Sequence, residues 1–200
     1  MKLKCLLYPI FCSLILTACA PMQPRLSELP IPPSRLVQKG YSLMPPNEKG
    51  WLVAGRNEYQ LALVKGGSNP DETTAIQAMP FRIMNFETTD ELVRLIKDGQ
   101  AKDTDPQRFS IKKHEVVAYV KKGVNCAKSH MITEDKAAVK RTGKSGFMIL
   151  EALTLTCAHP ENRNMAINVT YSHRYYPEHR NVSFIDQALN ILNSIEFSDI

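Results

Sequence analysis

The segments Glu151-Ala-Leu-Thr-Leu-Thr-Cys157 and Met165-Ala-Ile-Asn-Val-Thr-Tyr-Ser-His173 decide the fold. In both, large apolar residues alternate with small or polar ones, which is the period of a β-strand with one buried face. A turn at residues 161–164 sets Cys157 opposite Ile167. We therefore expect an antiparallel hairpin, and the same register places Leu155 opposite Val169 and Leu153 opposite Tyr171.

The same register pairs Glu151 with His173 at the rim of the inner face. A carboxylate beside an imidazole can orient the ring and raise its pKa, as a general base requires. This pair is the candidate catalytic dyad of a small periplasmic hydrolase, although no nucleophile is identifiable beside it. A structural pair, or a bulge that turns Glu151 outward, explains the same residues.

The first 18 residues have the layout of an export signal. Lys2 and Lys4 precede an apolar run that stops at small residues near Ala18. The run is shorter than the roughly 20 residues of a membrane-spanning helix, and Pro9 interrupts it. We expect residues 1–18 to be a signal peptide rather than a membrane span.

The sequence Leu16-Thr17-Ala18-Cys19 resembles the lipobox of bacterial lipoproteins. The resemblance implies that the Cys19 thiol receives a diacylglycerol, that the chain is cleaved before Cys19, and that the new amine is acylated, for example by palmitate. Two or more acyl chains hold a protein stably on a bilayer, at about 0.8 kcal/mol per buried CH₂. Because Ala20, not aspartate, follows Cys19, the resemblance favours the outer membrane, facing the periplasm.

Two cysteines remain after the lipobox, Cys126 and Cys157. An oxidising envelope favours a disulfide between them, and the midpoint of the intervening chain lies beside the turn-like Thr142-Gly143-Lys144. We therefore expect a bridge across an antiparallel hairpin. Two separate thiols, or a metal site with His130 and His159, are the alternatives, but the spacing matches no recognised zinc motif. We assign no metal and no cofactor.

The domain organisation follows from proline content. Five prolines and few large apolar residues occupy residues 19–38, which predicts an extended tether at about 3.1 Å per residue. Residues 39–200 are expected to form one domain. Its helices are predicted to begin at Thr88 and at Ser183, and Gly99 is the expected end of the first.

The remaining segments predict an α+β fold of six or seven mainly antiparallel strands packed with two helices, an α/β sandwich. The order of elements resembles the PsbP and Mog1 family, from Gly40-Tyr-Ser-Leu-Met-Pro and Trp51 to a closing helix that ends in Asn193-Ser194-Ile195-Glu196-Phe197. The members of that family are mostly accessory and binding proteins. The resemblance therefore implies no catalytic residue.

Composition and charge limit the partners. The chain is 44% hydrophobic and 22% charged, as folded domains are. Without Lys2 and Lys4, 23 basic residues face 20 acidic ones, a surplus too small to indicate nucleic-acid binding. An aromatic and basic cluster follows the last predicted strand: Arg174, Tyr175, Tyr176, His179 and Arg180. Because tyrosine and arginine are favoured at protein interfaces, these are the candidate partner-binding residues. An ordinary solvated loop explains the same cluster.

These features predict a lipid-anchored envelope protein whose domain is a non-catalytic binding or accessory module for a protein partner. A hydrolase using Glu151 and His173 is the alternative. A third possibility, an apolar-ligand-binding domain, predicts an open pocket between sheet and helix.

Overall fold

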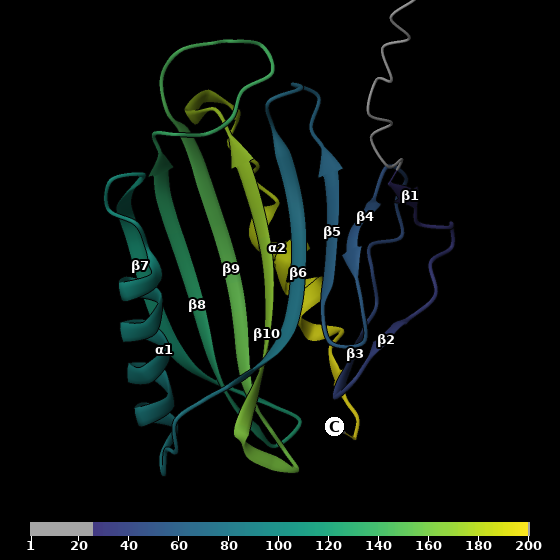
Figure 1. Ribbon diagram of the computed structural model, residues 1–200, viewed down its shortest axis with the longest axis vertical. Helices are drawn as coiled ribbons and strands as arrows, with labels where there is room; N and C mark the ends of the chain where they lie inside the picture. Colours follow the sequence, from purple (N-terminus) through teal and green to yellow (C-terminus); the bar gives the residue numbers. More distant parts are fainter. Residues whose placement is uncertain (1–25, 200) are drawn as a thin grey trace, which may run out of the picture.

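The computed structural model describes residues 26–199 and has an α+β fold (Figure 1). An eight-stranded antiparallel sheet has the order β1-β4-β5-β6-β10-β9-β8-β7, and a small sheet has the order β11-β3-β2. The class is as predicted, but the strands are more numerous than six or seven. The strands are β1 (Ser27–Glu28), β2 (Leu36–Gln38), β3 (Tyr41–Leu43), β4 (Leu52–Arg56), β5 (Leu61–Gly66), β6 (Thr73–Arg82), β7 (Phe109–Lys121), β8 (Val124–Asp135), β9 (Met148–His159), β10 (Asn162–Tyr175) and β11 (Glu196–Phe197). The helices are α1 (Thr89–Asp103), the short 3₁₀ helix η1 (Pro177–His179) and α2 (Phe184–Asn193).

The hairpin of β9 and β10 has the register expected from the alternation. Cys157 lies opposite Ile167, Leu155 opposite Val169 and Leu153 opposite Tyr171. The ladder is irregular only next to the turn, between Asn162 and Ala166. The hairpin prediction is confirmed.

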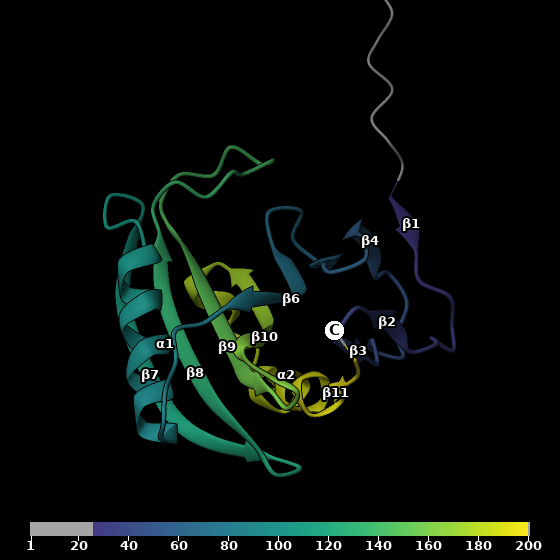
Figure 2. The same ribbon diagram turned by 60° about the horizontal axis from the view of Figure 1, so that its bottom comes forward.

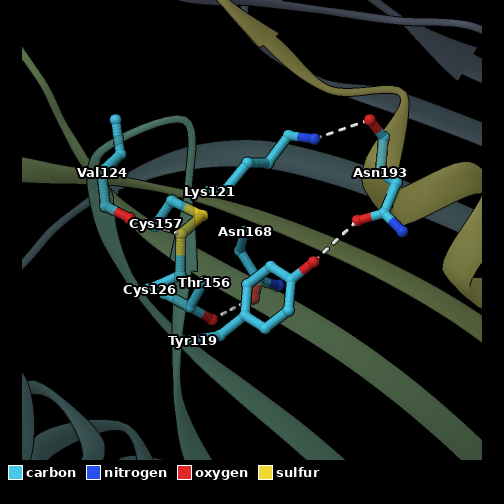
Figure 3. Close-up of a disulfide and its surroundings, with 8 residues drawn as sticks. All are labelled: Tyr119, Lys121, Val124, Cys126, Thr156, Cys157, Asn168 and Asn193. Atoms are coloured by element: carbon cyan, nitrogen blue, oxygen red, sulfur yellow. Dashed lines mark hydrogen bonds between the residues drawn. A yellow bond between two sulfur atoms is a disulfide. The ribbon is translucent and has the colours of Figure 1, made fainter.

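The predicted disulfide joins β8 to β9. Cys126 and Cys157 are direct register partners with a Cα–Cα distance of 4.0 Å, and their sulfur atoms are bonded (Figure 3). Beside the bridge, Lys121 Nζ donates to the carbonyl of Asn193 at 2.6 Å, and Tyr119 Oη donates to the Asn193 side chain at 3.0 Å. A lysine at the last carbonyls of a helix is favourable. These contacts tie the end of β7 to the end of α2.

The two faces of the large sheet are covered differently (Figures 1 and 2). Helix α2 and the small sheet pack on one face and bury the main apolar core. Helix α1 packs on the other face, chiefly over β7 and β8. The main core includes Trp51, Leu61, Leu63, Ile76, Leu155, Ile167, Val169, Phe184, Ala188 and Leu192.

The folded part begins earlier than Lys39. Strand β2 pairs with β3 in the small sheet, and β1 pairs with β4 at the edge of the large one. Leu29 and Leu36 are only 8% and 6% exposed. The tether prediction is therefore wrong for residues 26–38, because these two leucines are part of the core. Cys19 and the signal sequence lie outside the described residues.

Helix α1 begins where predicted and ends later. The Thr88 hydroxyl accepts a hydrogen bond from the backbone N–H of Glu91 at 3.2 Å, as in an N-cap. The helix continues through Gly99 to Asp103, so the predicted end at Gly99 is wrong. No helix within residues 26–199 is long and apolar enough to cross a membrane.

Candidate functional site

Glu151 and His173 are register partners, as predicted, but their side chains are not hydrogen-bonded to each other. The Glu151 carboxylate instead accepts from His130 Nε2 at 2.8 Å and from Tyr175 Oη at 2.9 Å. His130 reaches Glu151 diagonally from β8, where it lies opposite Leu153. The predicted dyad is therefore replaced by a three-residue cluster.

The proton on His130 can be placed from its two partners. Lys113 Nζ lies 3.0 Å from His130 Nδ1. Because an ammonium group can only donate, Nδ1 accepts and the ring proton is on Nε2, directed at Glu151. Lys113 also pairs with Glu115 at 3.0 Å. The result is a chain of polar contacts running from the sheet edge to Tyr175.

Glu151 is almost fully buried and still ionised. Burial alone would raise the pKa of its carboxyl group, but the hydrogen bonds from His130 and Tyr175 outweigh that effect and lower it. Burial, together with Glu151, raises the pKa of Tyr175 far above its ordinary value. A carboxylate with both oxygens occupied and a lowered pKa is suited to hold strands together rather than to abstract a proton near pH 7.

His173 lies beside this cluster. Its ring stacks on that of Tyr175 with centroids 4.8 Å apart, and burial lowers its pKa although Glu72 and Glu151 oppose the shift. Its Nδ1 atom is buried and has no hydrogen-bond partner within the described part of the chain. His173 is therefore a neutral ring at pH 7.

The predicted partner-binding cluster is divided between the interior and the surface. Tyr175 and Tyr176 are buried, whereas His179 and Arg180 are exposed. Tyr176 Oη donates to Asp71 at 2.6 Å, and His179 Nδ1 donates to Glu72 at 2.5 Å. The half-buried Arg174 pairs with Asp135 at 3.2 Å. The two tyrosines thus brace the end of β10, and partner binding by the exposed residues stays a prediction.

The two histidines considered as metal ligands are engaged elsewhere. His130 contacts Glu151, and His159 Nε2 lies 2.9 Å from the Ser198 carbonyl. Both remaining cysteines form the disulfide. Within residues 26–199, no cluster of three or more His, Cys, Asp or Glu side chains is arranged to hold a metal ion.

A groove between α1 and the sheet is a further candidate binding site. The apolar-ligand alternative predicts a pocket between sheet and helix, but none of the residues of this groove was predicted as a site residue. The groove has a volume of about 480 Å³ and runs between the end of β6 and the helix. Met84, 70% exposed, lies at its mouth. Its wall residues are Met79, Phe81, Arg82, Ile83 and Met84 from β6 and the segment after it, Leu95, Ile96, Gly99, Gln100 and Asp103 from α1, and Thr156 and Asn168 from the hairpin.

Gly99 keeps this groove open. Glycine inside a helix is less favourable than alanine by about 1 kcal/mol, so its presence there requires a reason. A Cβ atom built at Gly99 has no neighbour within 4 Å, which shows that helix packing does not demand glycine. A larger side chain at this position would occupy the groove. Two features of the sequence could have indicated the groove. Large apolar residues gather around Phe81, and a later segment with a helical pattern contains Gly99.

The sheet beside the groove forms a neutral face. Thr156 Oγ1 donates to Asn168 at 2.8 Å, and the Thr154 and Thr170 hydroxyls are 2.9 Å apart. A second cavity, of about 230 Å³, adjoins the groove and shares Met79 and Asn168 with it. We call this surface, together with the groove, the open face. Its uncharged strand residues, which alternate with core residues, are Ala62, Ala75, Gln77, Met79, Ala152, Thr154, Thr156, Asn168, Thr170 and Ser172. Thr154 and Thr156 are buried, and the charged residues Arg82 and Asp103 line the groove and Arg56 the second cavity.

No protein-family model matches this chain, and no curated protein sequence is significantly similar to it.

Proposed function

We propose that this protein is a lipid-anchored envelope lipoprotein whose domain binds a protein partner on the open face. The groove beside α1 is the observation that carries the proposal. It combines exposed methionines, which adapt to varied partners, with a wall in which, among residues 26–199, Arg82 and Asp103 are the only charged ones. Depletion of charge is typical of the centre of protein interfaces.

The occupant that suits this surface is an amphipathic helix of the partner. Helix α1 covers chiefly β7 and β8, which leaves β9, β10, β6 and β5 beside it. Strands spaced about 4.8 Å apart leave room for one further helix of about 10 Å diameter. A helix laid parallel to α1 would insert its apolar side chains between Met79, Met84 and Gly99, as helix-in-groove recognition does.

The anchor is supported by the sequence Leu16-Thr17-Ala18-Cys19. Lipidation of Cys19, export by residues 1–18 and an outer-membrane position facing the periplasm belong to this proposal, as does the likeness to PsbP and Mog1 proteins. The predicted hydrolase is the weaker candidate, because Glu151 would first have to exchange His130 and Tyr175 for His173.

Photo-crosslinking in intact cells tests the proposal. A photoreactive residue is placed at Met79 or Met84, and at Val37, an exposed control position in the small sheet. We expect the same envelope protein to be captured from both groove positions and not from Val37. Gly99→Leu should abolish capture by filling the groove, and Cys19→Ala should reduce it by removing the anchor.

Two results would contradict this function. Capture no greater than at Val37 would remove the binding surface, and capture that persists unchanged in Gly99→Leu would place the partner elsewhere. The volume of the groove also lies in the range of small-molecule sites. A lipid or other apolar molecule recovered from the purified protein, and displaced by Gly99→Leu, would identify the site as the ligand pocket instead.

A further inference from the structure

The loop between β8 and β9, residues 136–147, and the segment 180–182 lie at the same end of the molecule (Figure 1). Val139 and Val182 are 84% and 94% exposed, the highest values among the large apolar side chains of the described residues. Lys136, Arg141 and Arg180 are exposed next to them. We call these two segments the basic end.

The loop of the basic end is fixed by a buried carboxylate. Asp71 accepts hydrogen bonds from the backbone N–H groups of Arg141 at 2.5 Å and Thr142 at 2.9 Å, and from the hydroxyl groups of Thr142 and Tyr176. Burial alone would raise the pKa of Asp71, but these bonds outweigh it and hold the pKa well below its usual range. Lys144 Nζ lies 3.9 Å from the Tyr176 ring centroid, which braces the loop further.

Most acidic groups at this end are turned inward or paired; Asp186, exposed in the first turn of α2 without an ion pair among residues 26–199, is the exception. Asp71 and Glu72 are buried, and exposed Glu178 pairs with Lys144 at 2.8 Å. Asp135 is buried and pairs with Arg108 and Arg174.

The cations at this end point outward. Lys136, Arg141 and Arg180 have no ion-pair partner within residues 26–199. The surface of the basic end is therefore positive, with two apolar side chains projecting from it.

Exposed cations beside exposed apolar side chains are the composition that binds an anionic lipid surface. The apolar groups enter the headgroup boundary, and each basic residue adds electrostatic attraction to anionic lipids. The position of the chain agrees with this orientation, because both views place β1, where the described residues begin, toward the same end as the basic loop (Figures 1 and 2).

We propose that the basic end docks on the anionic phospholipid headgroups of the membrane that holds the lipid anchor. This inference rests on the proposed anchoring at Cys19. The strands of the large sheet lie along the long axis of the molecule, with the basic end at one end of that axis (Figure 1), so docking would stand the sheet upright on the bilayer. The open face would then be directed sideways, where a partner in the same membrane or beside it can reach the groove.

Vesicle flotation tests the docking without the anchor. The protein is the chain from residue 19 onward with Cys19→Ala, which keeps every described residue. It is mixed with vesicles of phosphatidylglycerol in phosphatidylcholine, or of phosphatidylcholine alone. A basic residue near an anionic surface contributes about fivefold in partition. The triple variant Lys136→Glu, Arg141→Glu, Arg180→Glu should therefore lose at least about a hundredfold in binding to the anionic vesicles.

The matched control is Lys97→Glu, Lys122→Glu, Arg163→Glu, which makes the same charge change at exposed positions in α1, in the β7–β8 turn and near the β9–β10 turn. It should retain most of the binding. Equal binding to both kinds of vesicle, or an equal loss in both triple variants, would overturn the docking surface. Palmitate incorporation in cells, compared between the native protein and Cys19→Ala, tests the anchor separately, so the two proposals can fail independently.

Discussion

The two faces of the large sheet are built from alternate residues of the same strands, yet they have opposite character. On β9, Leu153 and Leu155 enter the main core under α2, whereas Thr154 and Thr156 point to the opposite face, where they are buried beside the groove. The closed face is mainly apolar, with the buried cluster of Glu151, His130 and Tyr175 near the start of β9. The open face is mainly uncharged along its strands, is joined by hydroxyl and amide hydrogen bonds, and carries a groove with Arg82 and Asp103 in its wall.

This difference indicates where the fold is fixed and where it is free to bind. Burial of apolar side chains provides most of the free energy of folding, and that burial is concentrated on the closed face. Substitutions on the open face should therefore change binding more than stability. Four measurements test this division, from the largest expected effect to the smallest.

The disulfide should give the largest effect on the closed face. Replacing both cysteines, Cys126→Ala with Cys157→Ala, removes a bridge that spans 31 residues. The chain-entropy model predicts a loss of about 3.5 to 4 kcal/mol in the free energy of unfolding. Denaturant unfolding measures it, and the reduced native protein is the control, which should lose a similar amount. A loss below about 1 kcal/mol would show that the closed face holds β8 and β9 together without the bridge.

A matched pair of apolar truncations compares the faces directly. Leu155→Ala removes a side chain that is 1% exposed, and a loss of about 3 kcal/mol in the free energy of unfolding is expected from the lost burial and the cavity. Met79→Ala on the open face, where the side chain is 39% exposed, should lose less than about 1 kcal/mol. Similar losses in the two variants, measured by denaturant unfolding, would contradict the division.

The buried Glu151 cluster predicts a pH-dependent contribution to stability. The folded-state pKa of Glu151 is lowered, so its contribution is present above the unfolded pKa of about 4.3 and is lost as pH falls through the folded value. Glu151→Gln should lower the free energy of unfolding at pH 7 by about 1 to 3 kcal/mol. The reason is that the glutamine NH₂ group, itself a donor, would face His130 Nε2 or Tyr175 Oη, which are also donors. The difference from the native protein should shrink below about pH 4.

The control for this prediction is Glu115→Gln. Glu115 is exposed and pairs with Lys113, so the substitution should change stability by less than about 1 kcal/mol. Unfolding curves at a series of pH values measure both variants. A Glu151→Gln difference that stays constant down to pH 3 would show that the pKa of Glu151 is the same in the folded and unfolded states, which would contradict the lowered pKa.

The closed face was largely predictable from local patterns. Alternation of residues fixed the β9–β10 register, and cysteine pairing fixed the β8–β9 register. Together these two registers also place His130 opposite Leu153, one diagonal step from Glu151. The true partner of Glu151 was therefore within reach of the sequence, but the prediction considered only one hairpin.

Other features depend on contacts between segments far apart in the chain. Asp71 and Tyr176 are 105 residues apart and meet through two loops. Leu36 becomes a core residue through the small sheet, and Leu29 through the pairing of its segment with the Trp51 region, so proline content alone misplaced the domain boundary. The groove also depends on where α1 lies on the sheet, which the pattern of neither element specifies.

Gly99 should give the smallest change in stability and the clearest separation of stability from binding. Gly99→Ala should raise the free energy of unfolding by about 0.5 to 1 kcal/mol, since alanine favours the helix and its Cβ atom meets no neighbour within 4 Å. Gly99→Leu should keep that fold but fill the groove, and partner capture at Met84 should disappear. Ala101→Leu, on the exposed side of the same helix, is the control and should leave capture intact.

The sign of the Gly99→Ala effect decides what the glycine does. A gain in stability means that the helix would be better without the glycine, so its presence is explained by the space it leaves in the groove. A loss would instead mean that α1 needs a close approach at this turn, and the groove would then be a consequence of helix packing. If Gly99→Leu also left capture unchanged, the open face would be an uncovered surface and not a binding site.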